Sequence, residues 1–277
     1  MKNGVIFAIL TSLVFSIMNA LVKAVSLSIP STEVAFFRSF IGTILLYFIM
    51  KGNKVKFSKE GIPLLMTRGL LGALYLITYF YTISKIPLTD ASILVHMSPI
   101  FAIILSTIFL KEKLSKNSLY LLPIAFLGAM LLIKPFNYST YSVEALFGLL
   151  SALLSAAAGI TIRLLTKRKH HTYEIIFYFL AIGTVVSIPL MWNSFIMPTP
   201  LEFFYLLCIG IVSLLGQVFL TKAFTHESAI VVEITRYIGI VFNAIWGFVF
   251  WKEIPDTLTV LGGVLIITSC IALSKQK

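Results

Sequence analysis

The chain repeats itself at an offset of 141 residues. Two long apolar runs end in the same Lys-Glu pair, Lys111-Glu112 in the first half and Lys252-Glu253 in the second. The same offset joins five further identical positions: Glu33 with Glu174, Phe36 with Phe177, Gly42-Thr43 with Gly183-Thr184, and Gly69 with Gly210. Each half contains five apolar segments. Because five is odd, a second half that spans the membrane starts from the opposite side to the first, and the halves are predicted to be inverted repeats.

The apolar segments are long enough to cross a membrane. Hydrophobic residues make up 58% of the 277 positions and charged residues only 12%, with a mean hydropathy of +0.98, whereas a soluble domain carries about 25% charged residues. A helix of about 20 apolar residues spans the hydrocarbon core and satisfies its own backbone hydrogen bonds. We predict an all-α membrane protein with ten transmembrane helices, over residues 4–25, 33–50, 63–83, 90–110, 118–133, 145–165, 173–192, 201–221, 229–250 and 257–274.

Positive charge is distributed unevenly among the predicted loops. The net charge is +11, and the loops on one side of the membrane, together with both chain ends, hold most of it. The opposite loops hold little beyond Lys23, Lys85, Lys134 and Lys252. Since Lys and Arg favour the cytoplasmic side, we expect both termini in the cytoplasm and the protein in the cytoplasmic (inner) membrane. Charge that alternates between loops does not form one basic surface, which argues against a nucleic-acid partner.

The two repeats are expected to form one membrane domain, with the first repeat over residues 1–137 and the second over 138–277. The connections between segments are short, and none is long enough for a soluble domain. Cys208 and Cys270 lie inside apolar runs, without metal-ligand spacing around them, and free cysteine behaves there as a small hydrophobic residue. We therefore expect no metal site, no cofactor and no disulfide framework.

Ionisable residues inside apolar segments are the main candidates for function, because each costs about 2.5–3.5 kcal/mol to insert and usually faces a cavity or a partner. Arg236 and Glu233 lie three residues apart in the ninth segment, so they share one helix face. Arg236 is predicted to bind a substrate carboxylate, with Glu233 as its partner or as a proton or cation site. The alternative is an internal ion pair that only allows the helix to insert.

Polar and aromatic residues supply further candidates. His96 and Tyr237 are equivalent at the repeat offset, so the pseudo-two-fold axis would place them on opposite cavity walls. Histidine titrates near neutral pH and could couple substrate movement to protons; a neutral, hydrogen-bonded histidine is the alternative. The remaining predicted binding residues are Asn19, Tyr75, Tyr79, Gln217 and Asn243.

Three arginines lie nearer the ends of their segments. Arg38 follows Glu33 at the start of the second segment, and the two are predicted to pair as an outer gate. Arg68 and Arg163 lie near cytoplasmic helix ends. We expect these two to extend to the lipid headgroups, because long cationic side chains can reach the interface along apolar surface.

The paired five-helix pattern resembles the drug/metabolite transporter superfamily, specifically its EamA-type ten-helix members. The resemblance covers nearly the whole chain. It implies a secondary transporter that moves a small polar metabolite by alternating access, with a cavity between the halves. The local matches are Glu33-Val-Ala-Phe-Phe-Arg38, Arg68-Gly69-Leu70, Pro87 through Pro99 to Leu110-Lys-Glu112, Lys222-Ala-Phe224, Arg236-Tyr237 and Glu253.

Within this superfamily, the words around Glu33, Lys222 and Arg236 look most like the S-adenosylmethionine uptake carriers. The resemblance therefore favours uptake or exchange of S-adenosylmethionine, whose base or sulfonium would suit tyrosine faces. An exporter of amino acids or related metabolites is the alternative. The implied partners are a small-molecule substrate and membrane lipid, while a coupled proton or counter-substrate, and the choice between monomer and homodimer, are left open.

Other classes lack their sequence signatures. The chain contains no Gly-x-Ser-x-Gly, no His-Glu-x-x-His and no Walker-type Gly-Lys-Ser/Thr motif, which argues against an intramembrane enzyme and an ATP-driven pump. No channel filter sequence is present either.

Positions where the two halves differ are predicted to form the binding site, since one asymmetric substrate needs different groups on the two walls. The differing pairs are Arg38 with Phe179, Glu233 with Ser92, Arg236 with Val95, and His96 with Tyr237.

Overall fold

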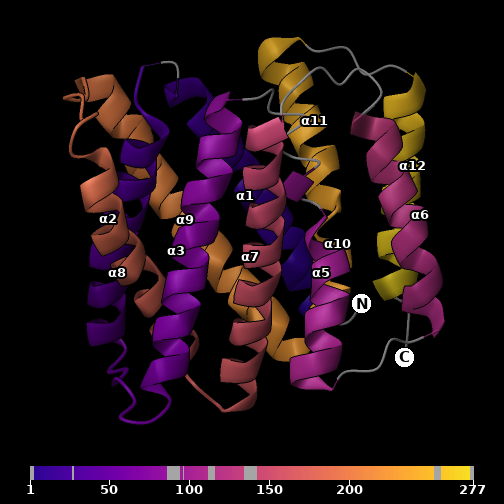
Figure 1. Cartoon of the computed structure of the whole chain (residues 1–277), viewed down its shortest axis with the longest axis horizontal. Helices are drawn as coiled ribbons and strands as arrows, with labels where there is room; N and C mark the ends of the chain where they lie inside the picture. Colours follow the sequence, from indigo (N-terminus) through magenta and orange to yellow (C-terminus); the bar gives the residue numbers. More distant parts are fainter. Residues whose placement is uncertain are drawn as a thin grey trace.

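The structure is a computed structural model that describes residues 3–26, 28–85, 94–95, 97–111, 116–133, 142–252 and 257–274. These residues form a bundle of helices without a strand among them, as predicted (Figure 1). The elements are α1 (Asn3–Val25), α2 (Ser31–Gly52), α3 (Ile62–Lys85), α5 (Ser98–Leu105), the π-helical η1 (Ser106–Leu110), α6 (Lys116–Ile133), α7 (Ser142–Lys167), α8 (Thr172–Met191), α9 (Pro200–His226), α10 (Ala229–Thr235), α11 (Ile238–Trp251) and α12 (Thr257–Ser274).

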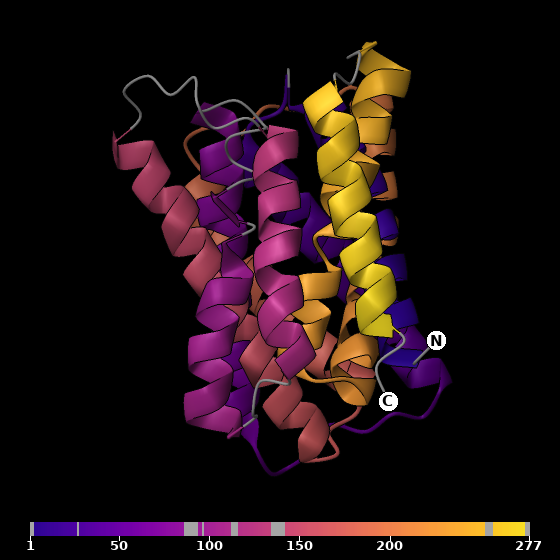
Figure 2. The ribbon, with the colours of Figure 1, turned by 90° about the vertical axis from the view of Figure 1, so that its right-hand side faces the viewer.

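Seven stretches of the described chain are long and apolar enough to cross a membrane: α1, α2, α8 and α9, most of α3 and α7, and α10 together with α11. Large apolar side chains cover the outside of the bundle, such as Phe48, Val185 and Leu201, which are each more than 60% exposed. In water such a surface would be strongly unfavourable, whereas in lipid it needs no cover. The two termini lie near the same end of the bundle in both views (Figures 1 and 2). A total of ten spanning helices, and the side on which the termini lie, stay predictions.

The repeated Lys-Glu pair marks a helix end in each half. Lys111 and Lys252 both adopt the left-handed conformation, with φ of 53° and 55°, directly after η1 and α11. This conformation commonly ends a helix because it redirects the chain, and glycine usually takes it. The two copies therefore end their fourth helical segment with the same backbone turn.

The halves are interleaved rather than placed side by side. α1 packs on α9, α3 on α7, α2 on α8, and α6 on α12, so that each of these pairs joins one helix from each half. In Figure 1 the α2 and α8 pair lies at one end of the long axis and the α6 and α12 pair at the other. The remaining helices of both halves lie between these two pairs.

A pseudo-two-fold axis passes between α2 and α8. Thr43 and Thr184, which are equivalent at the repeat offset of 141 residues, meet with their hydroxyl oxygens 3.5 Å apart. Glycines allow the helices to approach closely here, because a Cβ at each glycine would press on a residue of the other half. The contacts form two pairs that are equivalent at the repeat offset: Gly42 against Leu180 with Gly183 against Ser39, and Gly69 against Ile182 with Gly210 against Ile41. The repeated glycines thus have a packing role at the interface of the halves.

Candidate functional site

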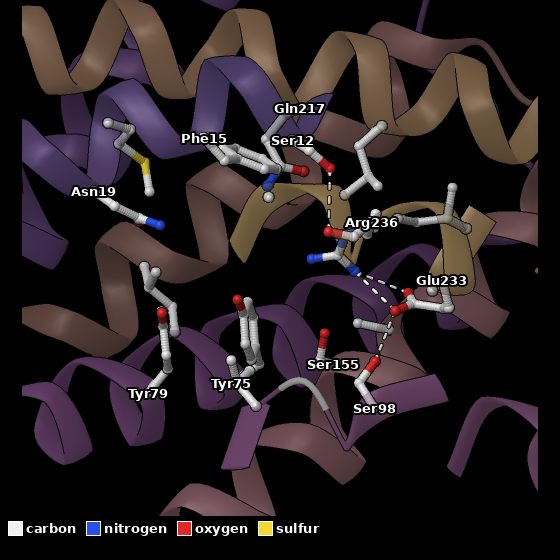
Figure 3. Close-up of a pocket in the computed structure, with 18 of the residues that line it drawn as sticks. Ser12, Phe15, Asn19, Tyr75, Tyr79, Ser98, Ser155, Gln217, Glu233 and Arg236 are labelled. Carbon is white, nitrogen blue, oxygen red and sulfur yellow. Dashed lines mark hydrogen bonds and ion pairs between the residues drawn. The ribbon is translucent and has the colours of Figure 1, made fainter. Parts of the chain in front are cut away.

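A cavity of about 110 Å³ lies between the two halves. A single water needs only about 10–15 Å³ of comparable volume, so the space exceeds that of a structural water. Helices α1, α2, α3, α7, α8 and α9 contribute to its wall, together with the segment around α5 and the junction of α10 and α11. Polar and charged side chains point into it from several sides (Figure 3).

The helix that carries Arg236 is interrupted at the cavity. α10 ends at Thr235, and tighter bonds replace the helical pattern: Tyr237 N–H donates to the Ile234 carbonyl (3.2 Å) and Gly239 N–H to the Arg236 carbonyl (2.9 Å). The Ser12 hydroxyl of α1 also lies 3.4 Å from the Arg236 carbonyl. Backbone that leaves the helical pattern at membrane depth is tolerated where it lines a cavity or is buried in protein.

Arg236 and Glu233 form a balanced ion pair at this junction. Arg236 Nη1 lies 2.9 Å and 3.0 Å from the two Glu233 carboxylate oxygens, and Ser98 donates to the same carboxylate at 2.7 Å. Glu233 is only 3% exposed. Gly159 of α7 leaves room for the carboxylate, since a Cβ there would lie 3.2 Å from one of its oxygens. The pair is thus neutral and hydrogen-bonded without a ligand.

Arg38 and Arg68 form a second cationic cluster on the wall. Their guanidinium carbons lie 5.4 Å and 4.4 Å from the centre of the same ring, Phe179. Arg68 also donates to the Gln217 side-chain oxygen at 3.4 Å. Both arginines are at most 3% exposed, and the Nε and Nη1 atoms of each lack a hydrogen-bond partner within the described chain. No carboxylate pairs with either side chain in that part of the molecule.

Aromatic and amide groups form another part of the wall. Tyr75 and Tyr79 of α3 stack with their rings 5.9 Å apart and nearly parallel, at 11°. The Asn19 amide lies 3.5 Å from the Asn243 side-chain oxygen across the two halves. Figure 3 shows the Tyr75 side chain directed toward the Arg236 guanidinium. This wall offers neutral hydrogen-bonding groups and ring faces.

Seven of the predicted binding residues line this cavity together: Asn19, Tyr75, Tyr79, Gln217, Glu233, Arg236 and Asn243. Tyr237 does not lie among the lining residues. Its side chain is fully buried in an apolar cluster with Ile230, Ile234 and Ile240, because it leaves the interrupted helix on the other face. His96 lies outside the described residues. Whether the lining residues bind substrate stays a prediction.

The expected outer pair of Glu33 and Arg38 is not formed. Glu33 accepts a hydrogen bond from the Ile196 N–H (3.0 Å) at the loop that precedes α9, whereas Arg38 lines the cavity. Residues five apart on a helix do not share a face, while those three or four apart do. The two side chains therefore leave α2 in different directions, and the prediction of a joint gate is wrong in this respect.

Arg68 is a cavity residue that the sequence reasoning assigned to the lipid interface. A signal for its position lies four residues further along α3, where Gly72 leaves the space that the guanidinium and Phe179 occupy. Arg163, which was also expected at the lipid interface, contacts the protein backbone. It donates to the carbonyls of Phe224 (2.7 Å) and Thr225 (3.1 Å) and so satisfies the C-terminal turn of α9. Serines also contribute to the wall without having been predicted, namely Ser12, Ser16, Ser98 and Ser155.

The cavity wall uses equivalent positions of the two halves with different residues. Arg38 and Phe179 both line it, as do Val95 and Arg236, which are two of the differing pairs singled out in the sequence. Leu76 with Gln217, and Ser98 with Gly239, follow the same rule. The fold is therefore symmetric while the chemistry of the cavity is not.

Comparisons with known proteins agree with this architecture. The EamA-like transporter family matches residues 2–134 and again 142–275. A pseudopaline exporter, CntI, of Pseudomonas aeruginosa is 58% identical and covers 100% of this chain and 98% of its own. An S-adenosylmethionine uptake transporter of Rickettsia bellii is 30% identical over 95% of this chain and 90% of its own.

A crystal structure of another protein shares the fold at only 15% identity, with a TM-score of 0.83 over 98% of this chain and 96% of that one. The family match covers both halves, and the similar proteins are membrane transporters of small metabolites. The chain thus belongs to the EamA-like transporter family, as a multi-pass inner-membrane protein that transports a small metabolite.

Proposed function

We propose that this protein exports a small, carboxylate-bearing metabolite from the cytoplasm by alternating access. The observation that carries the substrate chemistry is the charge of the cavity, which is lined by three arginines and one glutamate among the described residues. Arginine presents a planar fork of donors that matches a carboxylate. The interrupted helix at Arg236, between two interleaved halves, is the usual position of a substrate site in transporters built from inverted repeats.

Export rather than uptake is supported by the similarity to the pseudopaline exporter, which extends at 58% identity over the whole chain. We infer that the substrate belongs to the same class of metabolite as pseudopaline. This choice favours the alternative that the sequence left open over the uptake of S-adenosylmethionine.

Uptake of S-adenosylmethionine is the second candidate. It is supported by relatives that are 28–30% identical and by the stacked Tyr75 and Tyr79, whose ring faces suit a base or a sulfonium. The charge of the cavity opposes it. A sulfonium and an ammonium group outweigh the single carboxylate of that molecule, and a net cation is repelled by two arginines that have no carboxylate partner in the described chain.

Complementation tests the proposal. The full chain is expressed in a Pseudomonas aeruginosa strain that lacks its pseudopaline exporter, and pseudopaline is measured by mass spectrometry in the medium and in the cells. We expect the ratio of external to internal pseudopaline to return towards that of the parent strain. Arg168→Gln, at an exposed position outside the cavity, is the matched control and should complement equally.

A ratio equal to that of the empty vector, with the protein present in the membrane, would argue against this class of substrate. Uptake of labelled S-adenosylmethionine by the same cells would favour the second candidate.

A further inference from the structure

The arginine cluster of Arg38, Arg68 and Phe179 contains two buried positive charges that have no counter-charge among the described residues. Burial leaves each side chain at most 3% exposed, and the Nε and Nη1 atoms of both have no partner within the described chain. A buried charge without a partner is strongly unfavourable, and such groups inside a membrane protein usually serve a substrate or an ion. Two guanidiniums over one ring add mutual repulsion to this cost.

In the described chain, Glu233, Glu33 and Glu174 make their hydrogen bonds to groups other than these two arginines, while Glu33 Oε1 has no partner there. Glu233 is bound by Arg236 and Ser98. Glu33 accepts from the Ile196 backbone near one end of α2, and Glu174 accepts from Ser58 (2.6 Å) and contacts His170 (3.1 Å) near the start of α8. Within the part of the chain that the structure describes, the neutral amide of Gln217 and the ring of Phe179 contact the two arginines. These groups orient a guanidinium but do not neutralise it.

The cluster is built to hold its geometry. Phe179 is 1% exposed and lies under both guanidiniums. Gly72 has no side chain where Arg68 and the ring meet. Gln217 fixes one nitrogen of Arg68, which leaves its Nε and Nη1 free to donate. Two adjacent forks with free donors form a site that a carboxylate can bridge or that two carboxylates can share.

We propose that Arg38 and Arg68 form an anion subsite distinct from the Arg236 and Glu233 pair, and that the substrate carries a net charge of about two negative units as carboxylates. Three arginines against one glutamate leave two positive charges on the described wall, and a substrate dianion makes the loaded cavity neutral. The inference deepens the proposed function, on which it rests for the statement that the ligand is a transported metabolite. It also places the main contact with the substrate carboxylates at the arginine cluster on Phe179, whereas the sequence predicted this contact at Arg236.

Ligand pairs that differ by one carboxylate test the charge requirement. Glutamate and glutamine are titrated against the purified full chain in nanodiscs at constant ionic strength, and binding is followed by the shift in unfolding temperature. Glutarate and inorganic phosphate are further probes. We expect glutarate, which is a dianion, to bind most tightly, and glutamate, whose ammonium leaves a net charge of minus one, to bind at least tenfold more tightly than the neutral glutamine. Equal binding of glutamate and glutamine by the wild-type protein would overturn the proposal, and phosphate that binds as tightly as the dicarboxylates would replace carboxylate recognition by a general oxyanion site.

Variants locate the subsite. Arg68→Gln and Arg38→Gln should reduce the preference for glutamate over glutamine to near one, whereas Arg68→Lys, which keeps the charge without the fork, should keep part of it. Arg168→Gln should keep all of it. A preference unchanged in both Gln variants would overturn the assignment of these residues. Because the ratio is measured on each folded variant, a general loss of stability does not imitate the result.

The failures of the two proposals can be told apart. If the wild-type chain restores pseudopaline export but Arg38→Gln and Arg68→Gln restore it equally well, the subsite is wrong and the export function stands. If the wild-type chain restores no export but discriminates glutamate from glutamine through Arg68, the subsite stands and the substrate class of the proposed function is wrong.

Discussion

Two arginine sites line the same cavity and differ in how their charge is balanced. Arg236 Nη1 lies 2.9 Å from the Glu233 carboxylate, and both residues belong to one interrupted helical segment of the second half. Arg38 and Arg68 come from two helices of the first half, lie on Phe179, and have no carboxylate partner in the described chain. The first site is complete without a ligand, so it contributes to the fold. The second is incomplete, and we infer that substrate completes it.

The largest expected effect is on stability, from removing one charge of the balanced pair. Glu233→Gln leaves Arg236 without its carboxylate, and breaking a buried ion pair in this way costs roughly 3 kcal/mol. The free energy of unfolding of the purified protein, measured by chemical denaturation in detergent, should fall by about that amount. The double variant Glu233→Gln/Arg236→Gln removes both charges and should recover most of it. A single variant as stable as the wild type would show that the pair does not support the fold.

The unbalanced site should respond in the opposite way. Arg38→Phe gives the first half the residue that the second half has at the equivalent position 179. Losing charge-assisted hydrogen bonds to substrate is worth about 1.5–3 kcal/mol, so export should fall by up to about a hundredfold. The free energy of unfolding should stay the same or rise, because one of two like charges is gone. Initial export rates and denaturation of the same preparation separate these effects, and a variant that loses stability but exports normally would contradict the distinction.

An intermediate effect on export is expected from filling the space beside the arginine cluster at Gly72. A methyl group in Gly72→Ala would press on Arg68 and Phe179, displacing the guanidinium, and should lower export about tenfold, the value of one weakened charged hydrogen bond. Gly52→Ala is the matched control, because a Cβ there meets nothing within 4 Å. Export rates per unit of membrane protein provide the comparison. Equal rates for the two variants would mean that the position of Arg68 is unimportant.

The smallest effect is expected on the symmetry axis. Thr43→Val and Thr184→Val each remove one side of the 3.5 Å hydroxyl contact. Both hydroxyls also donate to carbonyls of their own helices, so the contact is worth at most the average of about 0.6 kcal/mol for hydrogen bonds between membrane helices. Both variants should destabilise by similar small amounts, and a double-mutant cycle should give a coupling of at most that size. Export should not change. A loss of export in either variant would show that this symmetric contact is needed for transport, which contradicts the expectation.

The repeated elements were predictable from the sequence because residues at equivalent positions of the two halves have the same backbone conformation and packing role. Lys111 and Lys252 end equivalent segments with the same left-handed turn, and Gly42 and Gly183 make matching contacts across the axis. The disagreement between Arg38 and Phe179 also pointed to the cavity, where the two residues touch. These features follow from comparing equivalent positions and need no knowledge of helix orientation.

The orientation of individual side chains was harder to predict. Arg68 was expected at the lipid interface and Tyr237 in the cavity, but Arg68 lines the cavity and Tyr237 is buried on the far side of its helix. Sequence gives the depth of a residue along a membrane helix. Sequence gives the rotation of a helix about its axis only where one face of the helix is polar, and helices that are apolar on all faces lack this difference between faces. The interruption between α10 and α11 changes the rotation further.

Arg38 and Arg68 are thus inferred to serve the substrate and not the fold. Arg68→Gln tests this inference most directly, with export and the free energy of unfolding measured on the same preparation without ligand. Export should fall at least tenfold below the wild type, while the free energy of unfolding stays unchanged or rises. Export per folded molecule equal to the wild type, together with a loss of stability as large as that of Glu233→Gln, would contradict it.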